Sequence, residues 1–187
     1  MGGCRVRKLA DEDHSFTHGV PGFGFVIARR DALETTAGRS TSLSLDLYDQ
    51  WQGLENGHGK WRFTSPTHVV HAFAQALVEL TAEGGVEVRH ERYRSNQQRL
   101  IKRFHDAGLD AVIAPEAQSP IITAFGYPTP DFDFAAFYED LKQEGFVIYP
   151  GKVSEVDTFR IGTIGEVYPD DVDRLAEGGG GHRGGAF

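Results

Sequence analysis

Apolar residues recur at the helical spacing of three and four positions in two consecutive stretches of the chain. The first stretch starts at Thr67 and stops at the glycine pair 84–85, which ends or kinks a helix. Its apolar positions are Val70, Phe73, Leu77 and Leu80. The second stretch ends before Gly108, and its inward stripe consists of Tyr93, Gln97, Leu100, Ile101 and Phe104. We expect two helices in a row; the solvated face of the second carries Arg92, Arg94, Arg99, Lys102 and Arg103.

Two strand-like patterns precede these helices. The run "FGFVIA" at 23–28 follows Pro21 and Gly22, which predicts a buried strand entered through a turn. The segment "SLSLDLY" at 42–48 alternates apolar and polar residues, so it predicts an extended segment with its leucines on one face.

The last third of the chain changes to the order strand, helix, strand, strand, helix. "PIITAF" at 120–125 predicts a buried strand, and Asp133 caps a helix that Gly145 terminates. "FVIYPGK" and "TFRIGTIGE" predict two more strands, and "YPDDVDRLAE" predicts a short closing helix. From about residue 90 onward we therefore expect an α+β arrangement, with helices packed on one face of a small sheet.

Composition and charge exclude several classes of protein. The chain has 187 residues, of which 40% are hydrophobic and 25% charged, and no apolar run approaches the roughly 18 residues of a membrane helix. The formal net charge of −8 repels polyanions, so nucleic acid is not expected as a partner. Cys4 is the only cysteine, which excludes intramolecular disulfides and cysteine-based metal sites. Without a signal-peptide pattern, we expect a cytoplasmic protein that does not bind membranes.

Arg160 is a permanent charge in the middle of the β-branched run 158–166. Side chains alternate along a strand, so Arg160 points to the same side as Gly162, which has no side chain. A guanidinium beside open space is well shaped to bind a carboxylate or a phosphonate through two hydrogen bonds. The alternative is an internal ion pair with Glu166 or Glu155.

Several segments together resemble one enzyme family. They are "HGVPGFGFVIARR" at 18–30, "SLSLDLY", "HGKWRFTSPTHVVHAFAQALVEL" at 58–80, "SPIITAF" and "GFVIYPGKVSEVDTFRIGTIGEVY". Over roughly residues 18–175 the sequence is similar to the 2-aminoethylphosphonate:pyruvate aminotransferases. These enzymes are homodimers of the class V branch of fold-type I, dependent on pyridoxal 5'-phosphate (PLP). The resemblance implies transfer of an amino group from 2-aminoethylphosphonate to pyruvate, which yields phosphonoacetaldehyde and alanine.

The resemblance also implies a domain division and two binding residues. Residues 18–88 correspond to the end of the large α/β cofactor domain with a connecting helix, and 89–176 to the small α+β domain. Arg160, in the "FRIG" motif, is similar to the arginine that holds the anionic end of the substrate. Thr64, in "RFTSPT", is similar to the residue that reaches across the dimer to the cofactor phosphate. Without the resemblance, Thr64 would be interpreted as a turn or helix-entry hydroxyl.

The chain departs from the family pattern at both ends. The position of the lysine that binds the cofactor is Ser15, and a hydroxyl cannot form an imine or act as the amine base. We therefore assign no catalytic residue. Residues 1–17 form a lead-in unlike the family and 177–187 a glycine-rich tail, both expected to be poorly ordered. A truncated or frame-shifted reading of a longer gene explains this pattern, and family-like codons in the adjoining DNA would test it.

Two alternatives stay open on the sequence alone. The chain is either half of an enzyme, inactive by itself, or a non-catalytic module that persists as a binding or dimerising fragment. Within the enzyme class, a related class V enzyme acting on alanine or serine with glyoxylate is the second candidate, because substrate choice inside a family depends on few contacts.

Overall fold

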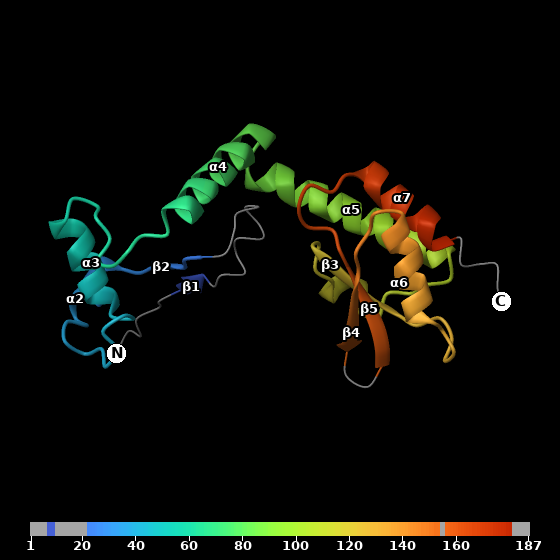
Figure 1. Ribbon diagram of the computed structural model, residues 1–187, viewed down its shortest axis with the longest axis horizontal. Helices are drawn as coiled ribbons and strands as arrows, with labels where there is room; N and C mark the ends of the chain where they lie inside the picture. Colours follow the sequence, from blue (N-terminus) through green and yellow to red (C-terminus); the bar gives the residue numbers. More distant parts are fainter. Residues whose placement is uncertain (1–6, 10–21, 154–155, 181–187) are drawn as a thin grey trace. The chain divides into compact units, whose positions relative to one another are not determined.

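The computed structural model describes residues 7–9, 22–153 and 156–180 (Figure 1). Contacts group the chain into two compact units, Met1–Glu79 and Leu80–Phe187. Most of the lead-in 1–17, including Ser15, lies outside the described residues, and so does the tail from 181 onward.

The first unit contains a two-stranded sheet and helices. Strand β1 (Arg7–Leu9) pairs antiparallel with β2 (Phe25–Ile27), and Lys8 lies opposite Val26. Helices α2 (Arg30–Glu34) and α3 (Leu47–Asn56) follow. Helix α4 (Thr67–Glu83) starts in this unit and ends in the next, as its apolar spacing predicted.

Two predictions for the first unit need correction. Segment 23–28 does contain a strand, but the side chains of Val26 and Ile27 are exposed, so the strand is not buried. Segment 42–48 is not extended: it consists of bends that lead into α3, and Leu43 and Leu45 are exposed. Asp46 caps α3, since its Oδ1 accepts a hydrogen bond from the backbone N–H of Asp49 at 3.0 Å. A capping carboxylate followed by apolar residues at helical spacing is a stronger determinant of local structure than a short alternation of apolar and polar residues, so the chain forms a helix here and not a strand.

The second unit is the predicted α+β layer. Its elements are α5 (Val86–Asp106), a 3₁₀ turn η2 (Pro115–Ala117), β3 (Ile122–Gly126), α6 (Phe134–Gln143), β4 (Tyr149–Val153), β5 (Val156–Gly162) and α7 (Pro169–Gly180). The sheet order is β3-β5-β4, all antiparallel, so β5 is central and has neighbours on both sides. Helix α7 packs against α5 and α6 (Figure 1).

A single hydrophobic core lies between this sheet and the three helices. The buried cluster comprises Leu100, Phe104, Leu109, Phe125, Phe137, Leu141, Ile148, Phe159, Ile161, Val172 and Leu175. Phe125 and Phe159 stack with ring centroids 5.7 Å apart, across the β3–β5 pair. Helices therefore cover one face of the sheet, as the sequence predicted. Asp133 caps α6 as expected, because its Oδ1 accepts from the backbone N–H of Ala136 at 3.0 Å.

The prediction that Arg92 lies on a solvated face is wrong. Its side chain is only 12% exposed, and its Nε donates to Glu83 Oε1 at 2.7 Å. Its Nη1 donates to the backbone carbonyls of Gly165 and Val167, at 2.8 and 3.1 Å. Arg89 Nε donates to the other oxygen of Glu83 at 2.6 Å. One carboxylate thus joins two arginines of α5, and Arg92 holds the loop that follows β5.

Candidate functional site

The open face of the three-stranded sheet carries Arg160. Because side chains alternate along β5, Arg160 projects away from the core that Phe159 and Ile161 enter. Its side chain is exposed, and its cross-strand neighbours are Ala124 on β3 and Tyr149 on β4. Tyr149 is itself 65% exposed. The central strand therefore presents a guanidinium on the face that α5, α6 and α7 leave uncovered.

The side chain of Arg160 lies across Gly151 of β4. A Cβ atom at position 151 would lie 2.8 Å from Arg160 Nε, closer than real Cβ atoms approach, and 3.2 Å from its Cγ, which is a tight contact. The hydroxyl of Thr158 donates to the Gly151 carbonyl at 2.8 Å, which fixes the same part of β4. Gly151 thus leaves the space in which the arginine stem rests.

Within the described part of the chain, the Arg160 guanidinium makes no hydrogen bond and no ion pair with a carboxylate. Glu166, one of the two internal partners considered from the sequence, accepts instead from the Tyr168 hydroxyl at 2.7 Å and lies 3.9 Å from Arg92 Nη2. Glu155, the other, is outside the described residues. An exposed guanidinium without an acidic neighbour is free to bind an external anion.

Gly151→Ala is expected to displace the Arg160 side chain while leaving the fold intact. The φ angle of Gly151 is not in the positive region, so alanine fits the backbone, and the free energy of unfolding should change by less than about 1 kcal/mol. The measurement is the ¹⁵Nε resonance of Arg160 by NMR, which should shift. Gly126→Ala is the matched control on β3, because a Cβ there meets only Val112 Cγ2 at 3.7 Å. Equal shifts in both variants would contradict the proposed contact.

The Glu83 cluster behind this face was not found from the sequence. Arg89 and Asn96 are buried, and Asn96 Nδ2 donates to the Val167 carbonyl at 2.7 Å. The hydrogen bond from Arg92, opposed by burial and helped by Arg89, lowers the pKa of Glu83 below its ordinary value of 4.5. The sequence did indicate that these two residues are buried: Arg89 and Asn96 lie at helical spacing from Tyr93 and Leu100, on the same inward face.

Thr64 lies in the loop that leads into α4, in the first unit, whereas Arg160 lies in the second. The Thr64 side chain is exposed and makes no hydrogen bond with the described residues. The nearby cation Arg62 is already engaged: it pairs with Asp49 Oδ2 at 3.1 Å and donates to the Leu43 carbonyl at 3.0 Å. A single hydroxyl does not make a PLP site, and Ser15 offers no amine. Of the two positions that the resemblance relates to the cofactor, one therefore offers an exposed hydroxyl in the described part of the chain, and the other, Ser15, offers no amine.

Solved structures identify the class to which this fold corresponds. An alanine–glyoxylate aminotransferase from Nostoc sp. superposes with a TM-score of 0.73 and 20% identity, over 90% of this chain and 46% of its own. A PLP-bound phosphoserine aminotransferase from Trichomonas vaginalis superposes with a TM-score of 0.69 and 21% identity, over 86% of this chain and 44% of its own. The fold is that of part of a fold-type I, PLP-dependent aminotransferase, as the sequence predicted.

Curated relatives of this chain in sequence carry the name of one particular transaminase. The chain is 60% identical over 159 residues to the 2-aminoethylphosphonate–pyruvate transaminase of Phocaeicola vulgatus, covering 85% of this chain and 44% of the relative. It is also 60% identical over 173 residues to the enzyme of that name from Bacillus cereus, covering 92% and 47%. No family model matches the chain. The predicted resemblance is confirmed, and the chain spans less than half the length of the relatives it matches.

None of the helices in the described part of the chain combines the length and the apolar composition needed to cross a membrane.

Proposed function

We propose that this chain provides one part of a PLP-dependent transaminase that moves the amino group of 2-aminoethylphosphonate to pyruvate. The observation that carries the proposal is the 60% identity to transaminases of that name over 85–92% of the chain. In this proposal the chain supplies the whole small domain and the end of the large one. Because Ser15 replaces the amine that the cofactor needs, the chain alone is expected to show no transaminase activity.

The relatives favour the phosphonate substrate over the glyoxylate alternatives. Relatives that are identical to this chain at 59–60% of the 159–173 aligned positions carry the phosphonate name. The glyoxylate enzymes superpose at only 19–20% identity, which reports the shared fold and not the substrate.

Arg160 is the residue that we assign to the substrate. Its guanidinium is exposed on the open sheet face, without a described acidic partner, and Gly151 leaves room beside it. Two parallel N–H groups match the oxygens of a phosphonate or of the pyruvate carboxylate. Chemistry of this kind positions a substrate and discriminates against uncharged analogues.

Thr64 and the dimer complete the proposal. We assign the Thr64 hydroxyl as a donor to the cofactor phosphate of the partner subunit in a homodimer, since it is exposed and has no described acceptor of its own. In the complete enzyme, PLP would supply the aldehyde carbon that accepts the amino group from one substrate and gives it to the other. We place the enzyme in the cytoplasm, where Cys4, the single cysteine of this chain, stays reduced.

A chimera tests the function. The segment of the Phocaeicola vulgatus relative that corresponds to residues 18–176 is replaced by those residues of this chain, so that the relative keeps its own residue at the position of Ser15, and alanine formation from 2-aminoethylphosphonate and pyruvate is measured. We expect turnover by the chimera. A chimera that folds and binds PLP but forms product only from alanine or serine with glyoxylate would show that the phosphonate assignment is wrong.

Arg160→Met in this chimera is expected to lower kcat/KM for 2-aminoethylphosphonate by roughly 10- to 100-fold, the worth of a hydrogen bond to a charged group. The kcat/KM of Arg160→Lys should lie between those of the unmodified chimera and of Arg160→Met, because lysine keeps the charge but cannot donate two parallel hydrogen bonds. The matched control is Arg94→Met, an exposed arginine of α5 that pairs with Glu91 on the same helix. Equal losses in Arg160→Met and Arg94→Met would exclude a substrate role for Arg160.

A further inference from the structure

The strand register places Arg160 in a row of three residues across the open face of the sheet. Its partner on β3 is Ala124, and its partner on β4 is Tyr149. Residues directly opposite each other in an antiparallel pair point to the same side, with Cβ atoms about 4.5–5.5 Å apart. Ile148, the residue before Tyr149, is buried in the core, so the Tyr149 side chain points away from the helices. Tyr149 therefore lies beside Arg160 on the exposed face.

The other residues around Arg160 on this face offer a ligand few hydrogen bonds. In the two adjoining rows of the same register they are Gly126, Thr158 and Gly151 on one side, and Ile122 and Gly162 on the other. The glycines have no side chain, and the buried Thr158 hydroxyl already donates to the Gly151 carbonyl at 2.8 Å. The exposed Tyr149 hydroxyl has no hydrogen-bond partner among the described residues. Around Arg160, Tyr149 is thus the described neighbour with a free donor.

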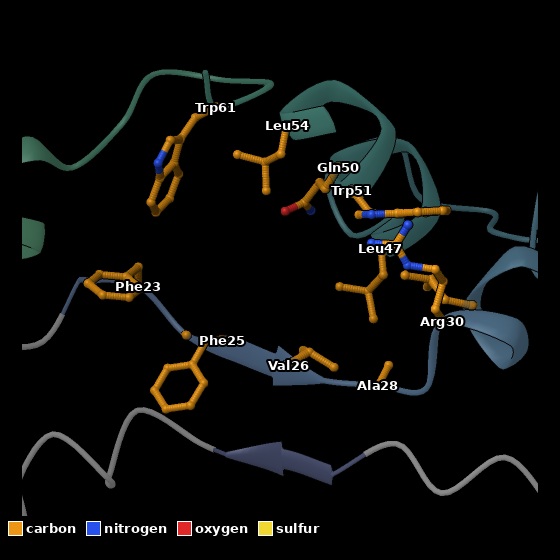
Figure 2. A pocket seen from close by; sticks show the side chains of 12 residues that line it. Phe23, Phe25, Val26, Ala28, Arg30, Leu47, Gln50, Trp51, Leu54 and Trp61 are labelled. Carbon is orange, nitrogen blue, oxygen red and sulfur yellow. The ribbon is translucent and has the colours of Figure 1, made fainter. Parts of the chain in front are cut away.

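The cavity of the first unit is less suited to an anion than this face. It has a volume of about 470 Å³ and lies between β2 and α3, lined mainly by apolar side chains such as Trp61 (Figure 2). Among the described residues that line it, Arg30 carries the only charge. The Arg30 Cζ lies 5.3 Å from the Trp51 ring centroid, and its Nη2 lies 3.6 Å from Glu55 Oε1. Arg30 therefore already has an aromatic and an acidic partner, unlike Arg160.

A phosphonate and a carboxylate differ in the number of oxygens that need a donor. Two parallel N–H groups of a guanidinium bind two oxygens, which satisfies a carboxylate and leaves the third oxygen of a phosphonate without a partner. We propose that Tyr149 selects a phosphonate over a carboxylate, because its hydroxyl donates to the third oxygen of the group that Arg160 binds. The proposal rests on the proposed function for the identity of the substrate. It adds the residue that distinguishes the phosphonate of 2-aminoethylphosphonate from the carboxylate of pyruvate.

The arrangement of the two side chains leaves room for an anion between them. The stem of Arg160 lies over Gly151, two positions further along β4 than Tyr149, and the guanidinium does not stack on the Tyr149 ring. Hydrogen bonds to a charged oxygen are about 2.5–2.9 Å long, so one tetrahedral group bridges two donors that do not contact each other. The phenol and the guanidinium can therefore hold the same phosphonate.

A titration of the full chain with two anions tests the role of Tyr149. The chain is labelled with ¹³Cζ-tyrosine and ¹⁵N-arginine and titrated at pH 7 with ethylphosphonate and with propionate, which share an ethyl group and differ in the anion. We expect ethylphosphonate to shift the resonances of both Tyr149 Cζ and Arg160 Nε, and propionate to shift only that of Arg160. Tyr149→Phe should raise the dissociation constant of ethylphosphonate roughly tenfold, the effect of one hydrogen bond to a charged group, and that of propionate less than about twofold. Tyr138→Phe is the matched control, because it removes the same oxygen from α6, on the core side of the sheet, and should change neither constant.

The same substitution in the chimera separates the two substrates. Tyr149→Phe should lower kcat/KM for 2-aminoethylphosphonate roughly tenfold, because the third phosphonate oxygen loses its donor. It should leave kcat/KM for pyruvate within about twofold, because a carboxylate needs only the two N–H groups of Arg160. Arg160→Met, in contrast, should lower both values.

Three outcomes of the titration overturn the proposal. They are an ethylphosphonate titration that leaves the Tyr149 resonance unshifted; equal weakening of ethylphosphonate and propionate by Tyr149→Phe, which would mean that the ring only packs beside Arg160; and equal effects of Tyr149→Phe and Tyr138→Phe. The titration does not require turnover. A chimera that converts 2-aminoethylphosphonate equally well with and without the Tyr149 hydroxyl contradicts the role of Tyr149 and leaves the proposed function standing. Selective phosphonate binding by the chain, together with a chimera that does not transaminate 2-aminoethylphosphonate, contradicts the proposed function alone.

Discussion

Phe159→Ala is expected to destabilise the second unit by roughly 3–5 kcal/mol, the usual cost of removing a buried phenylalanine. Phe159 has no exposed surface, and it lies at the centre of the aromatic part of the core. Its ring centroid lies between 5.3 and 6.4 Å from those of Phe125, Tyr127, Phe132, Phe134 and Phe137. The surrounding rings come from β3, α6 and the loop between them, which cannot all collapse into the space left by one residue.

Hydrogen exchange at amides of α5 and β5 measures this loss, because these elements open only when the second unit unfolds. Val147→Ala is the control in the same unit: its side chain is 60% exposed, so the change should stay within about 0.5 kcal/mol. If the two variants lost similar stability, Phe159 would not be the centre of this core. A secondary effect is expected at Arg160, since the packing of Phe159 fixes the rotation of β5 that points the next side chain outward.

The elements that the sequence predicted correctly have their determinants within a few residues of each other. Helix α6 is an example: Asp133 caps it, its apolar residues repeat every three and four positions, and Gly145 adopts a φ of +89° just beyond its end. Apolar spacing, capping residues and glycines close in the sequence also predicted α4, α5, α7 and the strands of the second unit. The prediction for segment 42–48 was wrong because Leu43 and Leu45 are 73% and 75% exposed, so their alternation with polar residues does not mark a buried face.

Arg92 and Arg160 show where local patterns stop being informative. The sequence predicted that Arg92, in an arginine-rich segment, lies on a solvated face, and that Arg160 lies beside open space or in an internal ion pair. Arg160 is exposed because the described helices of the second unit pack on the opposite face of the sheet, as the strand–helix order predicted. Arg92 is enclosed because the segment 165–168, more than 70 residues away, folds back onto α5. Contacts of such separation have no signature in the spacing of neighbouring residues.

The Glu83 cluster gives the second large effect. Glu83→Gln is expected to cost about 3 kcal/mol at neutral pH, because it leaves two enclosed guanidinium groups without their counter-charge. The side chains of Arg89 and Arg92 are only 5% and 12% exposed, so water replaces the lost partner poorly. Glu87→Gln, an exposed carboxylate of the first turn of α5, is the control and should change stability by about 0.5 kcal/mol or less.

The pH dependence of the unfolding free energy distinguishes a contribution from the charge of Glu83 from a contribution of its packing. The pKa of Glu83 is lowered in the folded chain, chiefly by the hydrogen bond from Arg92, so folding favours the ionised form. Its contribution is therefore fully present above the ordinary value of 4.5 and is lost as the pH falls through the lower folded value. The difference in unfolding free energy between the unmodified chain and Glu83→Gln should shrink on acidification. Amides of the loop 165–168, which Arg92 holds, should exchange faster in Glu83→Gln at pH 7 and converge with those of the unmodified chain in acid. A difference that stays constant down to acidic pH would mean that glutamine fails for steric reasons, and that charge is not what holds the loop.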